Sequence, residues 1–124
     1  MPYTILVVDD NSAIRQSLRH CIEQSPDWKV CGEAENGAVA VERVKELNPD
    51  VVVLDLQMPV MNGIEAARQI SIVAPNTTMV MFTMHCSEQL VKEAQAAGIR
   101  EVVSKSSGFT GHLLTSLKNL RSNR

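Results

Sequence analysis

The sequence predicts an α/β fold in which a parallel sheet of five strands is covered by helices on both faces. Five short apolar segments that resemble strands alternate with five segments whose apolar residues recur at helical spacing. Such alternation is typical of parallel sheets with right-handed crossover connections. A length of 124 residues suits one domain, so we expect a single unit spanning residues 1–124.

Two of the strand segments end in carboxylates. Val51–Leu54 is an unbroken aliphatic run followed by Asp55, and Tyr3–Asp9 is a second apolar segment that leads into Asp10. Unbroken runs of this kind are typical of strands buried on both faces. Because ligands bind beyond the carboxyl ends of parallel strands in open sheets, these acids indicate a functional site at one end of the sheet.

The first strand is followed by a helix that Asn11 or Ser12 can cap. Its apolar stripe consists of Ile14, Leu18, Cys21 and Ile22. Three charged residues lie away from that stripe: Arg15, Arg19 and Glu23. Ser25-Pro26-Asp27 ends the helix, and the weak alternation of Trp28–Glu33 predicts a second, more peripheral strand.

The middle of the chain predicts two more helices. The first begins at the Asn36-Gly37 turn and continues through Leu47. We expect it to bury Ala38, Val41 and Val44. The second helix follows Gly63 and ends near Pro75, so we expect it to be short. Its inward positions are Ile64, Ala67 and Ile70 or Ser71.

The last part of the chain continues the same alternation. Thr78–Thr83 is the fourth strand, and Glu88–Ala97 is a helix that Gly98 terminates. The inward residues of this helix are Leu90, Val91 and Ala94. Glu101–Lys105 predicts the fifth strand, and residues 110–120 predict the final helix. Its apolar stripe contains Leu113, Leu117 and Leu120, with Leu114 adjoining.

Composition excludes several classes of protein. The net charge is -2, aromatic residues make up 3%, and no dense basic block occurs, so we expect no direct contact with nucleic acid. The three cysteines lack paired spacing, which argues against a disulfide framework or a zinc site. No apolar run approaches the roughly 20 residues of a membrane span. We therefore expect a cytoplasmic protein.

The three acids Asp9, Asp10 and Asp55 favour a magnesium site. Converging carboxylates repel one another unless a cation lies between them, and an all-oxygen site suits Mg²⁺. The chemistry that this combination indicates is phosphoryl transfer, with Asp55 as a nucleophile that forms an acyl phosphate. A turn or helix-capping role is the simpler alternative for these residues.

Several motifs together resemble the receiver domain of bacterial response regulators. They are Val7-Val-Asp-Asp10, Leu54-Asp55 with Met58-Pro59 and Asn62-Gly63, Thr83, and Lys105. The resemblance covers nearly the whole chain. It implies a flavodoxin-like fold of three layers, with five parallel strands in the order 2-1-3-4-5.

The resemblance also implies a role for each site residue. Asp55 would be phosphorylated by a histidine kinase in a reaction that requires Mg²⁺. Direct metal ligands would be Asp10, Asp55 and the backbone carbonyl of Gln57, while Asp9 would act through bound water. Thr83 and Lys105 would contact the phosphoryl oxygens, although a strand threonine and a surface lysine are unremarkable by themselves.

The same resemblance also implies which partners the protein has. The resemblance implies a histidine kinase or phosphotransfer protein as donor, and an output domain or protein partner, including a homodimer, as receiver of the signal. Met84-His85 after Thr83 is similar to receivers of the NarL/LuxR type, which carry a helix-turn-helix module and regulate transcription. Val102 departs from the family, which commonly has an aromatic residue there that turns inward on activation.

Two other functions compete with a signalling module. A metal-dependent phosphatase with an aspartyl-phosphate intermediate requires a second acid two residues after the nucleophile, and this position is Gln57. A nucleotide or flavin binder on the same fold would carry a glycine-rich phosphate loop, and neither GxGxxG nor GxxxxGK[ST] occurs. We therefore predict a non-enzymatic receiver.

Overall fold

A parallel sheet with the strand order β2-β1-β3-β4-β5 organises the part of the chain that the computed structural model describes, residues 2–105 and 111–122. Its strands are β1 (Tyr3–Val8), β2 (Trp28–Ala34), β3 (Val51–Leu54), β4 (Thr78–Thr83) and β5 (Glu101–Ser104). The helices are α1 (Ser12–Ile22), α2 (Gly37–Leu47), α3 (Gly63–Val73), α4 (Glu88–Ala96) and α5 (Gly111–Ser122). The predicted α/β class and strand order are confirmed.

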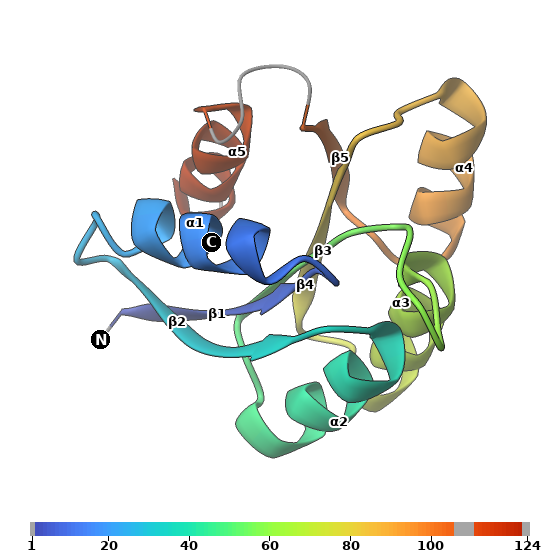
Figure 1. Ribbon diagram of the computed structural model, residues 1–124, viewed down its shortest axis with the longest axis horizontal. Coiled ribbons are helices and arrows are strands. Elements are labelled where there is room, and N and C mark those ends of the chain that lie inside the picture. The colour runs from blue at the N-terminus through green and yellow to red at the C-terminus, as the bar shows by residue number, and fades with distance from the viewer. Residues whose placement is uncertain (1, 106–110, 123–124) are drawn as a thin grey trace.

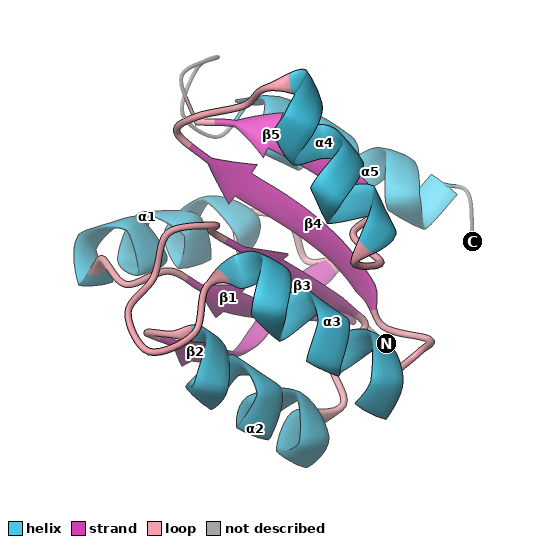
Figure 2. Ribbon diagram, turned by 90° about the vertical axis from the view of Figure 1, so that its right-hand side faces the viewer, coloured by secondary structure: helices cyan, strands magenta, loops and turns pink. Residues whose placement is uncertain are grey.

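Helices cover both faces of the sheet (Figures 1 and 2). Strand side chains alternate between the faces, as pleating requires. In β1, Leu6 and Val8 pack in the core beneath α2, α3 and α4, whereas Ile5 and Val7 pack in the core beneath α1 and α5. This three-layer arrangement leaves the carboxyl ends of the central strands open for a site.

Polar side chains cap four helices. Asn11, Asn36, Asn62 and Ser87 each accept a hydrogen bond from the backbone N–H three residues later. The cap of α1 is therefore Asn11, and neither Asp9 nor Asp10 occupies this position. A capping role does not account for the two acids.

Most element boundaries agree with the sequence predictions. The fourth strand is correct to the residue, while the first and fifth strands each end one residue early, at Val8 and Ser104. The predicted start of the last helix, Thr110, lies outside the described residues. Within α5, Leu113, Leu117 and Leu120 are buried as expected.

Three details of the helices were predicted wrongly. The helix after Gly63 is not short, because the Asn62 cap and Pro75 leave room for 11 residues, as many as in α1 or α2. Ala38 is only partly buried, because it lies at the margin of the buried stripe that Gly37, Ala40, Val41 and Val44 form. In α4, Val91 was expected to face inward but is only partly buried, beside the buried Leu90 and Ala94. None of the described helices is long and apolar enough to cross a membrane.

Candidate functional site

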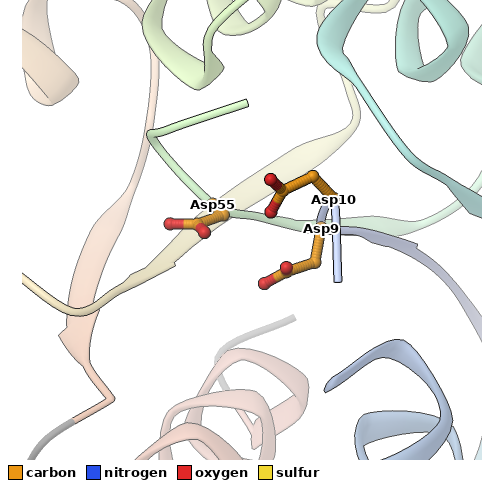
Figure 3. Close-up of side chains that lie close together, drawn as sticks. All are labelled: Asp9, Asp10 and Asp55. Carbon is orange, nitrogen blue, oxygen red and sulfur yellow. The ribbon is translucent and has the colours of Figure 1, made fainter. Parts of the chain in front are cut away.

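The three acids lie together just beyond the ends of β1 and β3 (Figure 3). Val8 pairs with Leu54 in the sheet, and the Asp55 N–H donates to the Val8 carbonyl at 3.1 Å. One carboxylate oxygen from each of Asp9, Asp10 and Asp55 lies within 4.8 Å of the others. Because β1 ends at Val8, both Asp9 and Asp10 are outside the strand and can turn toward the same space.

Lys105 lies between two of these carboxylates. Its Nζ donates to Asp9 Oδ2 at 2.7 Å and to Asp55 Oδ2 at 3.1 Å. The lysine side chain is 3% exposed, against 2% for Asp9 and 12% for Asp55. Because these side chains are largely buried, solvent screens the ion pairs of Lys105 with Asp9 and Asp55 much less than it screens a surface ion pair.

The pKa of Lys105 is raised above its usual value. Burial of the ammonium lowers this pKa, but the hydrogen bond to Asp9 and the charges of Asp55 and Asp9 together outweigh burial. The lysine is therefore a permanent cation at neutral pH. It compensates part of the negative charge of the acidic cluster.

The carboxylate set fits a hard divalent cation. Asp10 is exposed and Asp55 is partly exposed, so both present oxygen atoms to solvent at the open end of the sheet. Both oxygens of Asp9 already accept hydrogen bonds, Oδ1 from the Asn11 N–H at 3.0 Å and Oδ2 from Lys105. Mg²⁺ prefers oxygen ligands and retains several waters, which suits one or two direct carboxylates and a third that acts through water.

Close backbone packing holds the loop after Asp55. The Gly63 N–H donates to the Leu56 carbonyl at 2.8 Å, and a Cβ at Gly63 would collide with the Asp55 carbonyl oxygen. On the other side, the Gly37 N–H donates to the Met61 carbonyl at 3.0 Å. The loop is thus attached to the starts of α3 and α2, which limits movement of Asp55.

Thr83 and Gln57 are the two other residues that the sequence analysis assigned to the site. Thr83 ends β4, the strand beside β3, and its carbonyl accepts the Lys105 N–H at 2.8 Å. Thr83 is buried, whereas Gln57 is exposed in the loop two residues beyond Asp55. Thr83, at the end of β4, and Lys105, directly after the adjacent strand β5, therefore lie at the same end of the sheet as Asp55.

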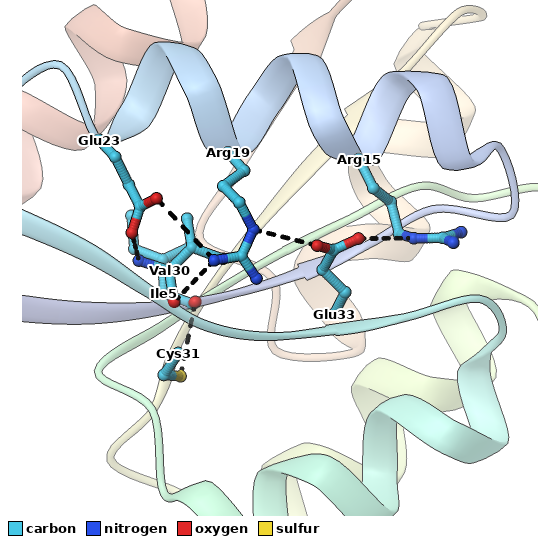
Figure 4. A network of polar contacts seen from close by, with 7 residues as sticks. All are labelled: Ile5, Arg15, Arg19, Glu23, Val30, Cys31 and Glu33. Atoms are coloured by element: carbon cyan, nitrogen blue, oxygen red, sulfur yellow. Dashed lines mark hydrogen bonds and ion pairs between the residues drawn. The ribbon is translucent and has the colours of Figure 1, made fainter.

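Sequence reasoning missed Arg15 and Glu33. Arg15 was placed with the charged residues away from the apolar stripe, yet its side chain is only 16% exposed. Its Nη1 donates to the Asp9 carbonyl at 2.7 Å. Its Nε donates to Glu33 at 3.0 Å, as Figure 4 shows. No local pattern identifies the contact between Arg15 and Glu33, because Arg15 lies on helix α1 and Glu33 follows 18 residues later on strand β2.

Comparison with known proteins identifies the family. The family described as response regulator receiver domain matches residues 5–117. This chain therefore belongs to the receiver domains of two-component response regulators, the signal-transduction modules that the sequence motifs predicted.

Individual relatives agree with this assignment. The chemotaxis protein CheY of Thermotoga maritima is 39% identical over 82% of this chain and 83% of that protein. The transcriptional regulatory protein YdfI of Bacillus subtilis is 37% identical over 82% of this chain and 47% of that protein. A crystal structure of a LuxR-family response regulator from Aurantimonas sp. SI85-9A1 has a TM-score of 0.92 at 32% identity, covering 100% of this chain and 88% of that chain.

The relatives differ in length. Although the chain corresponds to most of CheY, it spans between 21% and 47% of the length of seven further curated relatives. The receiver unit is therefore shared by proteins of different architecture.

Proposed function

We propose that residues 1–124 form one receiver domain that is phosphorylated on Asp55 by a histidine kinase or phosphotransfer protein, in a reaction that requires Mg²⁺. The observation that carries this proposal is the position of Lys105, whose ammonium bonds both Asp9 and Asp55 within the cluster of three acids. A buried cation beside a partly exposed carboxylate can neutralise charge that arrives with a phosphoryl group.

Metal binding in this proposal uses Asp10, Asp55 and the backbone carbonyl of Gln57 directly, and Asp9 through water. The two acids with the greater exposure are thus the direct ligands, and the buried Asp9 is the indirect one. Bound Mg²⁺ would neutralise negative charge on the phosphoryl oxygens during transfer.

Phosphoryl transfer forms one bond and breaks one. An Asp55 carboxylate oxygen attacks phosphorus, the bond from phosphorus to the donor histidine nitrogen breaks, and the electron pair remains on the imidazole, which takes a proton from solvent. Lys105 and the Thr83 hydroxyl stabilise the phosphoryl oxygens. Thr83 ends β4 and Lys105 directly follows the neighbouring strand β5, and these places support both roles.

The phosphorylated domain passes its signal to another domain or protein. It does not catalyse a reaction on a further substrate. Similarity to a LuxR-family response regulator and to a transcriptional regulatory protein supports a role in transcription regulation. A homodimer is one form that the partner can take. The net charge of -2 supports regulation of DNA binding through a partner or output domain rather than through direct contact. We place this module in the cytoplasm, where response regulators typically act.

The test is phosphorylation by a small donor. Incubation with acetyl phosphate and Mg²⁺ should add one phosphoryl group by intact mass, and Asp55→Asn should abolish the addition. Asp50→Asn is the matched control, because Asp50 precedes the same strand at its opposite end. Removing Mg²⁺ with a chelator, or replacing Asp10 by Ala, should strongly slow the reaction.

Two results would contradict the proposal. One is persistence of the added mass in Asp55→Asn. The other is steady hydrolysis of simple phosphoesters without an accumulating acyl phosphate, which would favour the metal-dependent phosphatase.

A further inference from the structure

Asp9 is held by its backbone as well as by its side chain. Its N–H donates to the Ala34 carbonyl at 3.1 Å, which continues the pairing of β1 with β2. Its carbonyl accepts a hydrogen bond from Arg15 Nη1 at 2.7 Å. Asp9 is 2% exposed, so this carbonyl depends on a protein donor rather than on bulk water.

Glu33 holds Arg15 in place. Glu33 Oε1 accepts from Arg15 Nε at 3.0 Å, while Oε2 accepts from Arg19 Nε at 3.1 Å (Figure 4). The guanidinium of Arg15 is planar and rigid, so fixing Nε with Glu33 also fixes the direction in which Nη1 donates to Asp9. The chain of contacts therefore runs from edge strand β2 through Arg15 to the acidic cluster.

The Asp9 carbonyl belongs to the peptide group that joins Asp9 to Asp10. This group is planar, so its orientation fixes the position of the Asp10 Cα and thereby restricts where the Asp10 side chain can lie. Asp10 lies outside regular structure and is exposed, and its own surroundings constrain it less than those of Asp9. Holding this carbonyl thus restricts the backbone from which both acids extend toward Asp55.

We propose that Arg15 and Glu33 are positioning residues for the divalent cation, acting through the peptide between Asp9 and Asp10. The inference rests on the proposed Mg²⁺ site and adds two residues to its support. Hydrogen-bonded partners of metal ligands commonly change metal affinity by about 10- to 100-fold when they are removed.

Arg15 and Arg19 form a matched pair for testing this inference. Both donate Nε to Glu33 at nearly equal distances, and only Arg15 also donates to Asp9. Arg19 instead contacts Glu23 and the Val30 carbonyl. Arg15→Gln and Arg19→Gln each remove one positive charge and one bond to Glu33, so they differ in the contact to the acidic loop.

Simple electrostatics and the positioning role predict opposite changes in the affinity for Mg²⁺ when Arg15 is replaced. Loss of a nearby positive charge should tighten binding of a cation. Loss of a positioning residue should weaken it. Arg15→Lys separates the two effects further, because it retains the charge but lacks the planar fork that contacts both Glu33 and Asp9.

The experiment measures the Mg²⁺ dissociation constant by calorimetric titration, together with the melting temperature of each variant. We expect Arg15→Gln to weaken Mg²⁺ binding about tenfold, and Arg15→Lys to weaken it measurably. Arg19→Gln should keep the dissociation constant within about twofold, even where its melting temperature falls as far as that of Arg15→Gln. Unchanged or tighter binding in Arg15→Gln, or equal weakening in Arg19→Gln, would overturn the inference.

A second measurement works without metal. The Asn11 N–H donates to Asp9 Oδ1, so its hydrogen exchange reports on the order of the acidic loop. Exchange should accelerate in Arg15→Gln and remain near the wild-type rate in Arg19→Gln. Failure of the wild type to bind Mg²⁺ would count against the proposed function, whereas equal Asn11 exchange in the two variants would count against the positioning role itself.

Discussion

Lys105 is the residue on which the charge balance of the site depends. It is nearly buried with Asp9, and Asp55 lies within hydrogen-bonding distance of the same ammonium. Removing one partner of a buried ion pair leaves the other uncompensated, and this costs more than the pair contributes as a whole. The lysine therefore supports the fold as well as the proposed chemistry.

Replacing Lys105 by Met should lower the free energy of unfolding by about 3 kcal/mol, because Asp9 loses its counter-charge. Mg²⁺ should then stabilise the variant more than it stabilises the wild type, since a cation between the acids replaces the missing charge. Urea unfolding with and without Mg²⁺ measures both effects. Lys45→Met is the control, because Lys45 makes only an exposed ion pair. Equal stabilisation of variant and wild type by Mg²⁺ would contradict this expectation.

Val60 is a strained residue in the loop after β3. Its φ is 69°, a left-handed conformation that is rare for a β-branched residue, and its side chain is 82% exposed. The Met61 N–H donates to the Pro59 carbonyl at 2.7 Å across Val60, which closes a three-residue turn. Burial of the valine side chain does not offset this strain.

Val60→Asn should therefore raise the free energy of unfolding, by about 1 kcal/mol, because asparagine tolerates the left-handed conformation better. Ile72→Asn provides a comparison at similar exposure, 80%, but within helix α3. There asparagine should be destabilising by about 0.5 kcal/mol, since it is a poor helix former. Urea unfolding measures the free energy of unfolding of both variants. Changes of the same sign in both would show that relief of strain at Val60 does not explain the effect of Val60→Asn.

At the scale of elements, the loop between β3 and α3 is shaped by close approach of two backbone segments. Gly63 begins α3 directly against the Asp55 carbonyl, and a side chain there would force strand end and helix start apart. The position of Asp55 relative to Asp9 and Asp10 thus depends on a glycine eight residues later in the chain.

Gly63→Ala should destabilise the protein by about 1–3 kcal/mol, the usual cost of forcing extra atoms into a packed region. Gly111→Ala is the matched control at the first residue of α5, where an added Cβ meets no atom within 4 Å. This control should be neutral or slightly stabilising, because alanine is the better helix former. Chemical denaturation of both variants provides the measurement, and equal destabilisation would show that the contact with Asp55 is unimportant.

At the scale of the whole molecule, the signal has to pass from the acidic end of the sheet to a surface that a partner contacts. Val102 in β5 pairs with Met81 and is partly buried against the core that contains Leu90 and Ala94 of α4. A valine is short and has few side-chain rotamers, so it cannot reproduce the inward turn of an aromatic ring. We therefore expect the response to pass through Thr83 and the segment that joins β4 to α4.

Beryllofluoride, a mimic of the phosphoryl group, should shift NMR signals from Thr83 through the start of α4 in the presence of Mg²⁺. The same changes should persist in Val102→Ala, because the valine side chain is not the moving part. Asp55→Asn should show no response and serves as the control. Loss of the α4 shifts in Val102→Ala would identify Val102 itself as the coupling element.

The sequence predicted most elements because their patterns are local. β4 was bounded correctly by its apolar run, and Gly98, with a φ of 98°, ends the α4 region where the glycine signal placed it. The acids and Lys105 were predicted as one site from motifs, and the structure brings them within hydrogen-bonding or metal-binding distance. Ala38 was predicted wrongly because it lies at the margin of the buried stripe of α2, where the packing of neighbouring elements decides how much of a side chain is covered.

By itself, the sequence determined the alternation of strands and helices, the aliphatic core and the residue types of the site, since these depend on neighbouring positions along the chain. Only the tertiary structure decided that Glu33 on β2 holds Arg15 against the Asp9 carbonyl, and that Lys105 bonds Asp9 across 96 residues of sequence. Such contacts depend on which strands pair and in what register, and strand pairing is a property of the folded sheet rather than of any local pattern.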